Sequence, residues 1–184
     1  MNFKKTLLQA FEVAKLNHPA MHAVYKDCSA TRIAVLIIFL SSLAGAMGSL
    51  LFPVKYGPVV YRPTVFEALS HALVAFFLIL GSIYLLPFVA NRFFKAHGTF
   101  DGLLRVIGHG YIIGFLNIFP VLALVVFLWM MVFIVKTLIE IKKLTAEKAI
   151  MALIVAVVVV FVFLTLFQDL NADNLYGGLY VIPN

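Results

Sequence analysis

One apolar stretch decides the fold of this chain: LLRVIGHGYIIGFLNIFPVLALVVFLWMMVFIVKTLIEI, residues 103–141. As a single helix its 39 residues would extend about 58 Å at 1.5 Å per residue. The hydrocarbon layer of a bilayer is only about 30 Å thick. Pro120 suits the first turn of a new helix and pushes the residue before it out of the helical region. The stretch therefore predicts two helices of about 19 residues each, joined by a tight turn at residues 117–120.

The composition of the whole chain is that of a membrane protein. Hydrophobic residues make up 64% of its 184 residues and charged residues 12%, whereas a soluble domain is about half apolar and about a quarter charged. A soluble globular domain and a disordered chain are therefore excluded. Cys28 is the only cysteine, which excludes an intramolecular disulfide and a multi-cysteine metal or redox site.

The positions of the charges favour five membrane crossings. Besides the long stretch, three runs without Asp, Glu, Lys or Arg are long enough to span, at residues 33–54, 68–91 and 149–168. With five crossings, twelve of the 14 Lys and Arg residues lie on one side, and only Lys55 and Arg62 lie on the other. Four crossings would divide them eight against six. The positive-inside rule thus predicts five, with the N-terminus in the cytoplasm and the C-terminus outside.

We therefore expect an all-α protein in three parts. Residues 1–30 form a cytoplasmic segment, residues 31–168 a bundle of five transmembrane helices, and residues 169–184 an external tail. The expected helices cover residues 31–52, 66–91, 101–118, 120–142 and 146–168.

The N-terminal segment carries apolar residues at helical spacing. Phe3, Leu7 and Phe11 recur on one side, whereas Lys4 and Lys5 lie elsewhere on the wheel, which predicts a short amphipathic helix. Such a helix can lie in the cytoplasmic interface and hold anionic lipid, or it can pack under the bundle as a cap. Periodicity alone does not separate the two.

Polar side chains inside a bilayer are costly, so each one needs a reason. Glu67 and His71 stand one helical turn apart at the outer start of the second expected span. They form either a proton- or cation-sensitive pair at a pore mouth or an interfacial pair solvated by headgroups and water, and the second is favoured because both lie near the helix end.

The third expected span carries the other polar candidates. Asp101 and Arg105 have the spacing of an ion pair along one helix. His109 lies deeper, where an imidazole can bond a neighbouring helix or relay a proton. Asn117 is most simply a turn or cap residue.

Small residues recur at every fourth position on the first and third expected spans, at Ser41, Gly45 and Ser49 and at Gly110 and Gly114. Such faces let helix backbones approach closely. They serve either packing within one chain, which is favoured, or a homodimer seam.

No motif indicates an enzyme or a cofactor. His18 and His22 could share a metal across one helical turn, but Pro19 separates them and no further ligand pair is near in the sequence, so we expect plain surface histidines. No nucleophile, base and orienting group occur at recognisable spacing, and no phosphate-binding loop or zinc pattern is present.

The residues GTFDGLLRVIGHGY at 98–111, followed by NIFP at 117–120, resemble the central signature of the Yip1 domain family. Asn17-His18-Pro19, Leu128-Trp129 and residues 145–149 fit as well. The resemblance implies five spans and a cytoplasmic N-terminus. Eukaryotic members act in traffic between endoplasmic reticulum and Golgi, and some bind Rab GTPases or shape membranes. Those members carry a longer N-terminal region with an Asp-Leu-Tyr-Gly-Pro-like motif, which is missing here, so Rab binding is not carried over and a bacterial or archaeal member is indicated.

Two functions follow as hypotheses. The first is a non-enzymatic protein of the Yip1 type that organises membrane, acts as a trafficking-like scaffold or recruits a protein partner through its N-terminal segment. Its expected partners include the lipid bilayer, with anionic lipid at the cytoplasmic face. The alternative is a small channel or transporter whose oligomeric pore uses Glu67, His71 and His109. Neither involves nucleic acid. The expected location is the inner membrane in a prokaryote, or the endoplasmic reticulum or Golgi in a eukaryote.

Overall fold

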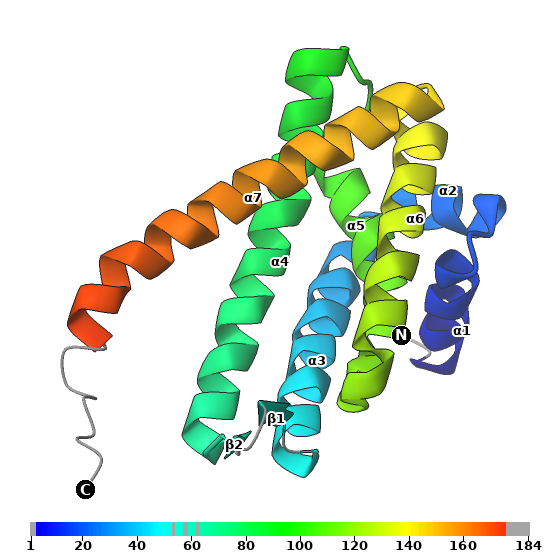
Figure 1. Ribbon diagram of the computed structural model, residues 1–184. Coiled ribbons are helices and arrows are strands. Elements are labelled where there is room, and N and C mark those ends of the chain that lie inside the picture. Colours follow the sequence, from blue (N-terminus) through cyan, green and yellow to red (C-terminus); the bar gives the residue numbers. More distant parts are fainter. Residues whose placement is uncertain (1–2, 53, 57–58, 62, 176–184) are drawn as a thin grey trace, which may run out of the picture.

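The computed structural model describes residues 3–52, 54–56, 59–61 and 63–175. Most of them are helical (Figure 1). The α-helices are α1 (Phe3–Ala14), α2 (His18–Lys26), α3 (Ala30–Leu51), α4 (Val65–Phe94), α5 (Phe100–Gly110), α6 (Ala123–Lys142) and α7 (Ala146–Leu175). Two 3₁₀ helices, η1 (Tyr111–Ile118) and η2 (Pro120–Leu122), connect α5 to α6. A two-stranded antiparallel hairpin of β1 (Val54–Tyr56) and β2 (Val59–Tyr61) joins α3 to α4, which the sequence did not predict.

Four helices in the described part of the chain are long and apolar enough to span a membrane. They are α3, α4, the continuous segment Pro120–Lys142, and α7 over Ala146–Thr165. Their bounds lie close to four of the five expected spans. The last helix continues to Leu175 rather than ending at residue 168, and residues 176–184 of the expected tail lie outside the described residues.

The remaining expected span, at residues 101–118, is not one α-helix. It consists of the 11 residues of α5 followed by the 8 residues of η1. Two glycines near the change of winding, Gly110 and Gly114, weaken the α-helix there. The hydroxyl of Ser41 on α3 also donates to the carbonyl oxygen of Tyr111 at 2.7 Å, which gives that oxygen a partner outside its own helix.

The composite segment α5–η1 runs parallel to α3. Three close approaches follow in the same order along both: Ala34 with Gly108, Ser41 with Gly114, and Gly48 with Ile118. In Figure 1, α4 lies to the left of both α3 and α5, and α7 crosses obliquely over α4. α5 is the central helix of the bundle, because every residue from Gly102 to Gly110 is buried.

The N-terminal segment folds as two helices against the side of the bundle. α1 ends just before Asn17, whose side chain accepts a bond from the amide of Ala20 at 3.2 Å and so caps α2. Ala10 and Ala14 of α1 are buried against α3 and η1. The indole Nε1 of Trp129 on α6 donates to the carbonyl oxygen of Ala14 at 3.1 Å. α1 therefore packs on the bundle, and it does so along the flank rather than as a cap beneath it.

Candidate functional site

A polar cavity lies between α3, α4 and η1 and has a volume of about 270 Å³. It brings together six of the residues that the sequence singled out, although they come from three separate segments: Ser41, Gly45, Ser49, His71, Gly114 and Asn117. The small residues make the space, because they leave room where larger side chains would close it. Gly114 therefore meets the small-residue face of α3 within one chain, whereas Gly110 packs against the ring of Phe133 on α6.

The serine hydroxyls of the cavity have partners in the backbone. Ser41 donates to Tyr111 as described, Ser42 donates to the carbonyl oxygen of Ile38 at 3.0 Å, and Ser49 donates to that of Ala46 at 2.7 Å. Since these hydroxyl protons point at carbonyl oxygens, the serines offer the cavity acceptor lone pairs. The cavity can thus hold water or a small polar group.

Glu67 and His71 have different surroundings although they are one turn apart. The carboxylate of Glu67 accepts a bond from the amide of Thr64 at 2.6 Å, and the hydroxyl of Thr64 accepts one from the amide of Glu67 at 3.2 Å. This is a capping box at the start of α4. His71, in contrast, lines the polar cavity and is exposed.

The expected ion pair between Asp101 and Arg105 is not present among the described residues. Arg105 is 9% exposed and points across to the N-terminal segment. Its Nε donates to the hydroxyl of Thr31 at 2.8 Å, and its Nη1 donates to the carbonyl oxygen of Tyr25 at 2.9 Å. Asp101 is exposed in the first turn of α5, where a carboxylate is favoured by the helix dipole. Arg105 therefore holds α2 and α3 onto α5.

His109 is enclosed in the core and is 1% exposed. Its Nδ1 lies 2.8 Å from the carbonyl oxygen of Arg105, one turn earlier in the same helix. Among the described residues, no hydrogen bond joins this ring to a neighbouring helix, in contrast to the expectation. Glu67, His71 and His109 lie at a helix cap, in the polar cavity and in the packed core respectively, so the fold does not bring them together.

Tyr25 explains the glycines at the start of the sequence signature. Its hydroxyl accepts a bond from the amide of Thr99 at 3.0 Å. A Cβ at Gly98 would lie 2.6 Å from that hydroxyl oxygen, and a Cβ at Gly102 would clash with the ring of Tyr25. Gly98 also has a φ of +94°, which other residues rarely adopt. The signature thus forms a seat for an aromatic ring from α2.

One buried cation was not predicted from the sequence. Lys142, at the end of α6, is fully buried, and its Nζ donates to the carbonyl oxygen of Gly98 at 2.8 Å and to Oδ1 of Asn91 at 3.2 Å. It ties the ends of α4 and α6 to the residues before α5. The position of Lys142 at the end of an apolar run carried no local signal for this role.

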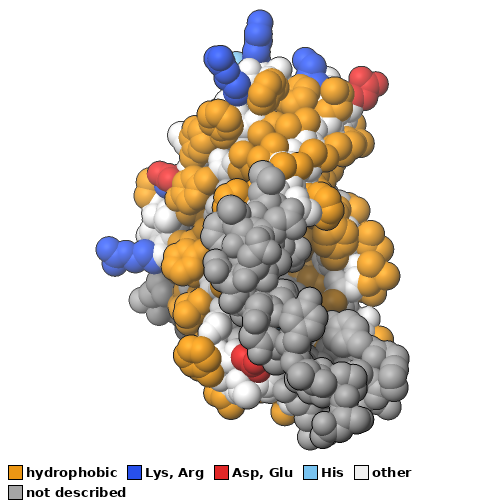
Figure 2. Space-filling model, turned by 60° about the vertical axis from the view of Figure 1, so that its left-hand side comes forward, with side chains coloured by type: hydrophobic (Ala, Val, Ile, Leu, Met, Phe, Trp, Pro, Cys, Tyr) orange, Lys and Arg blue, Asp and Glu red, His pale blue; other side chains and the backbone are white. Residues whose placement is uncertain are grey.

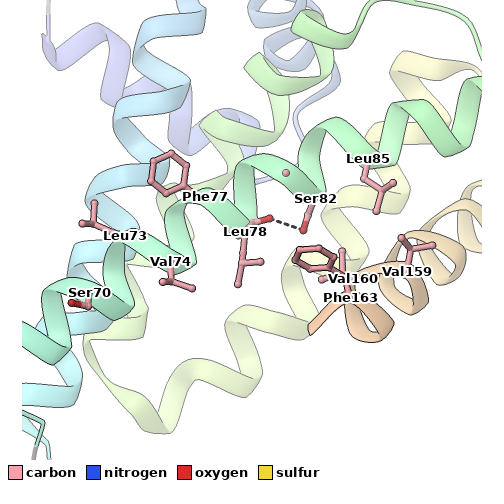
Figure 3. Close-up of a pocket in the computed structure, with 11 residues that line it drawn as sticks. Ser70, Leu73, Val74, Phe77, Leu78, Ser82, Leu85, Val159, Val160 and Phe163 are labelled. Atoms are coloured by element: carbon pink, nitrogen blue, oxygen red, sulfur yellow. Dashed lines mark hydrogen bonds between the residues drawn. The ribbon is translucent and has the colours of Figure 1, made fainter. Parts of the chain in front are cut away.

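An apolar groove lies between α4 and α7 and has a volume of about 780 Å³. Figure 3 shows its lining, which consists of aliphatic and phenylalanine side chains from both helices together with Ser70 and Ser82 of α4. The hydroxyl of Ser82 donates to the carbonyl oxygen of Leu78 at 2.7 Å. Ser70 and Ser82 are the two hydroxyl-bearing residues among the eleven that line the groove, and the other nine are aliphatic residues, phenylalanines and a glycine. Its shape and character suit a hydrocarbon chain.

Comparison with known proteins identifies the family. The family model described as Yip1 domain matches residues 17–167. This chain belongs to the Yip1 domain family. The match begins at the cap of α2 and includes every element down to α7, so it covers both the seat of Tyr25 and the polar cavity. Neither the curated proteins nor the solved structures contain a match. Together with the apolar helices, family membership makes the chain an integral membrane protein.

Proposed function

We propose that this Yip1-domain protein is a non-enzymatic membrane organiser that crosses the bilayer five times and gathers anionic lipid around a basic cytoplasmic end. The observation that carries the proposal is the clustering of cations. Among the side chains that the structure describes, seven exposed Lys and Arg residues belong to helix ends that meet at one end of the bundle or to the α1–α2 segment docked beside it: Lys15, Lys26, Arg32, Arg92, Lys95, Lys143 and Lys148. Figure 2 shows several of them projecting from one end above an otherwise largely apolar surface.

Five crossings are supported by the path of α5–η1. Eleven α-helical residues and eight 3₁₀ residues extend about 32 Å, which matches the hydrocarbon thickness. The segment also runs parallel to α3, and Pro120–Lys142 then runs back. A path with five membrane crossings places these seven exposed cations on the cytoplasmic side.

Two surfaces of different chemistry support the proposal that the protein binds lipid. The basic end offers charge to anionic headgroups, each cation near the surface contributing about 1 kcal/mol. The apolar groove between α4 and α7 offers space to an acyl chain. On α1, Leu8 and Phe11 are about half exposed and present an apolar surface to lipid or to a protein partner.

Cysteine labelling from each side of the membrane tests the crossings. Cys28 is exposed and serves as a native cytoplasmic reporter. Val121, which is 84% exposed at the start of the return segment, supplies the decisive position in a C28S/V121C variant. Five crossings predict that a membrane-impermeant maleimide labels V121C only from outside and Cys28 only from the cytoplasm. Labelling of both from the same side would contradict the path.

Two matched charge variants test lipid binding. K143Q/K148Q removes two cations from the basic end, and K55Q/R62Q removes the two cations of the opposite side. We expect native mass spectrometry to show retained phosphatidylglycerol in preference to phosphatidylcholine. Each cation near the surface contributes about 1 kcal/mol, which corresponds to about fivefold in affinity. The preference should therefore fall at least several-fold in K143Q/K148Q, and it should persist in K55Q/R62Q. A wild-type protein without preference, or equal losses in both variants, would contradict the proposal.

The polar cavity favours one second candidate, the passage of a small polar solute or a proton through a pore. We expect that, if the cavity conducts, flux in proteoliposomes between about pH 5.5 and 8, which brackets the ordinary histidine pKa, depends on His71. H71A should then abolish flux, whereas H109A should leave it intact, since the His109 ring is enclosed elsewhere. A folded wild-type protein that carries no flux would eliminate this candidate.

A further inference from the structure

Two histidines of α2 meet a glutamate of α6 at the side of the bundle. His18 Nε2 lies 2.8 Å from Oε2 of Glu140, and the ring centroids of His18 and His22 are 4.4 Å apart. One ligand atom from each of the three side chains lies within 4.8 Å of the others. Oε1 of Glu140 bonds Nζ of Lys136 at 2.7 Å, which leaves Oε2 directed at the histidines.

In the sequence, Pro19 counted against a metal shared by His18 and His22, but its position in the fold is compatible with such a metal. Pro19 lies in the first turn of α2, where a missing amide hydrogen is no loss because the first amides of a helix have no partner within it. The helix is therefore unbroken between His18 and His22, and both rings stand on one side. The third ligand, Glu140, is brought in by the packing of α2 against α6, which the sequence does not reveal.

One atom of this cluster has no partner. Nε2 of His22 is buried and makes no hydrogen bond within the described part of the chain. Nearly all buried polar side-chain atoms are paired, so such an atom calls for an explanation. A bound cation beside the ring would supply one.

We propose that His18, His22 and Glu140 form a binding site for a divalent transition metal of the zinc type, which fastens α2 to α6. Two imidazoles and one carboxylate are a zinc ligand set that leaves a fourth position for water. Imidazole nitrogen disfavours Mg²⁺ and Ca²⁺, which take oxygen ligands. Ligands about 2.0–2.2 Å from zinc stand roughly 3.3 Å apart, so modest side-chain rotations would close the set. The partial exposure of all three residues gives the ion a way in.

Metal binding to the full-length protein in detergent, purified without a histidine tag and stripped with a chelator, tests the site. Titration with Zn²⁺ against a chromophoric competitor should show one equivalent bound. H22A and E140Q should weaken that binding at least about tenfold, because each removes a ligand. C28S and H97A are matched controls, since Cys28 and His97 are exposed and stand outside the cluster, and both should bind as the wild type does.

Substitution with Co²⁺ provides a readout that needs no variant. A site with two nitrogen ligands and one oxygen ligand in tetrahedral arrangement should give the strong visible absorption of four-coordinate Co²⁺, displaced by one equivalent of Zn²⁺. The proposal is overturned if the wild type binds no stoichiometric metal, if binding survives H22A and E140Q, or if it disappears in C28S.

Discussion

Replacement of Gly108 by alanine should push α3 and α5 apart. The added Cβ would lie 2.6 Å from Cβ of Ala34 and 3.0 Å from its Cα and carbonyl oxygen. None of these atoms can rotate away, so the helices must separate by about 1 Å to reach an ordinary carbon contact of about 3.5–4.0 Å. Overpacking costs about 1–3 kcal/mol, and alanine returns about 0.5–1 kcal/mol of helix propensity. We therefore expect a net loss of about 1 kcal/mol in the free energy of unfolding.

Reversible unfolding by SDS in mixed micelles, followed through the fluorescence of the single tryptophan, Trp129, measures this loss. G81A is the matched control, because a Cβ at Gly81 in α4 meets no atom within 4 Å. G81A should be as stable as the wild type or more stable by up to about 1 kcal/mol. The second substitution A34G should restore most of what G108A loses. An unchanged midpoint for G108A, or a double variant no more stable than G108A, would refute the close approach of the two helices.

Three further predictions follow from single contacts. R105K should lower the free energy of unfolding by about 1.5–3 kcal/mol, measured in the same SDS assay, because lysine cannot bond both α2 and α3 in the geometry of the guanidinium. W129F should raise hydrogen exchange in α1 and leave the core unchanged, since only the bond to the carbonyl oxygen of Ala14 is lost. Hydrogen bonds from Ser29 lower the pKa of Asp27, so the folded state binds this proton less readily than the unfolded state. The resulting stability is present above about pH 3.9 and declines as the pH falls. In S29A that decline should be smaller.

Local patterns in the sequence predicted the elements whose cause is local. Apolar runs without charge placed α3 and the segment Pro120–Lys142 to within one or two residues, and Pro120 marked the start of that segment. The change to 3₁₀ winding after Gly110 was not predicted, because it depends in part on a hydroxyl from Ser41, 70 residues earlier in the chain.

The sequence identified most of the polar residues of the site, but it did not predict which residues they contact. Arg105 was paired with Asp101 because a carboxylate stood one turn away, but the fold offers it better-placed oxygen atoms on α2 and α3. Glu140 was not associated with His18 because more than 120 residues separate them. Spacing along one helix finds neighbours on that helix, and these contacts join different helices.

The parallel course of α3 and α5–η1 has a consequence for biosynthesis. Two parallel neighbours cannot be joined by a short turn, so the face of α3 that carries Ser41 must wait for a partner made about 70 residues later. At about 5–20 residues per second, the interval is about 4–14 s. During that time α3 presents serines and glycines to lipid or to the insertion machinery without the helix that covers them. A nascent chain arrested before Tyr111 would thus expose the surface that insertion factors and quality-control proteases can distinguish from a finished bundle.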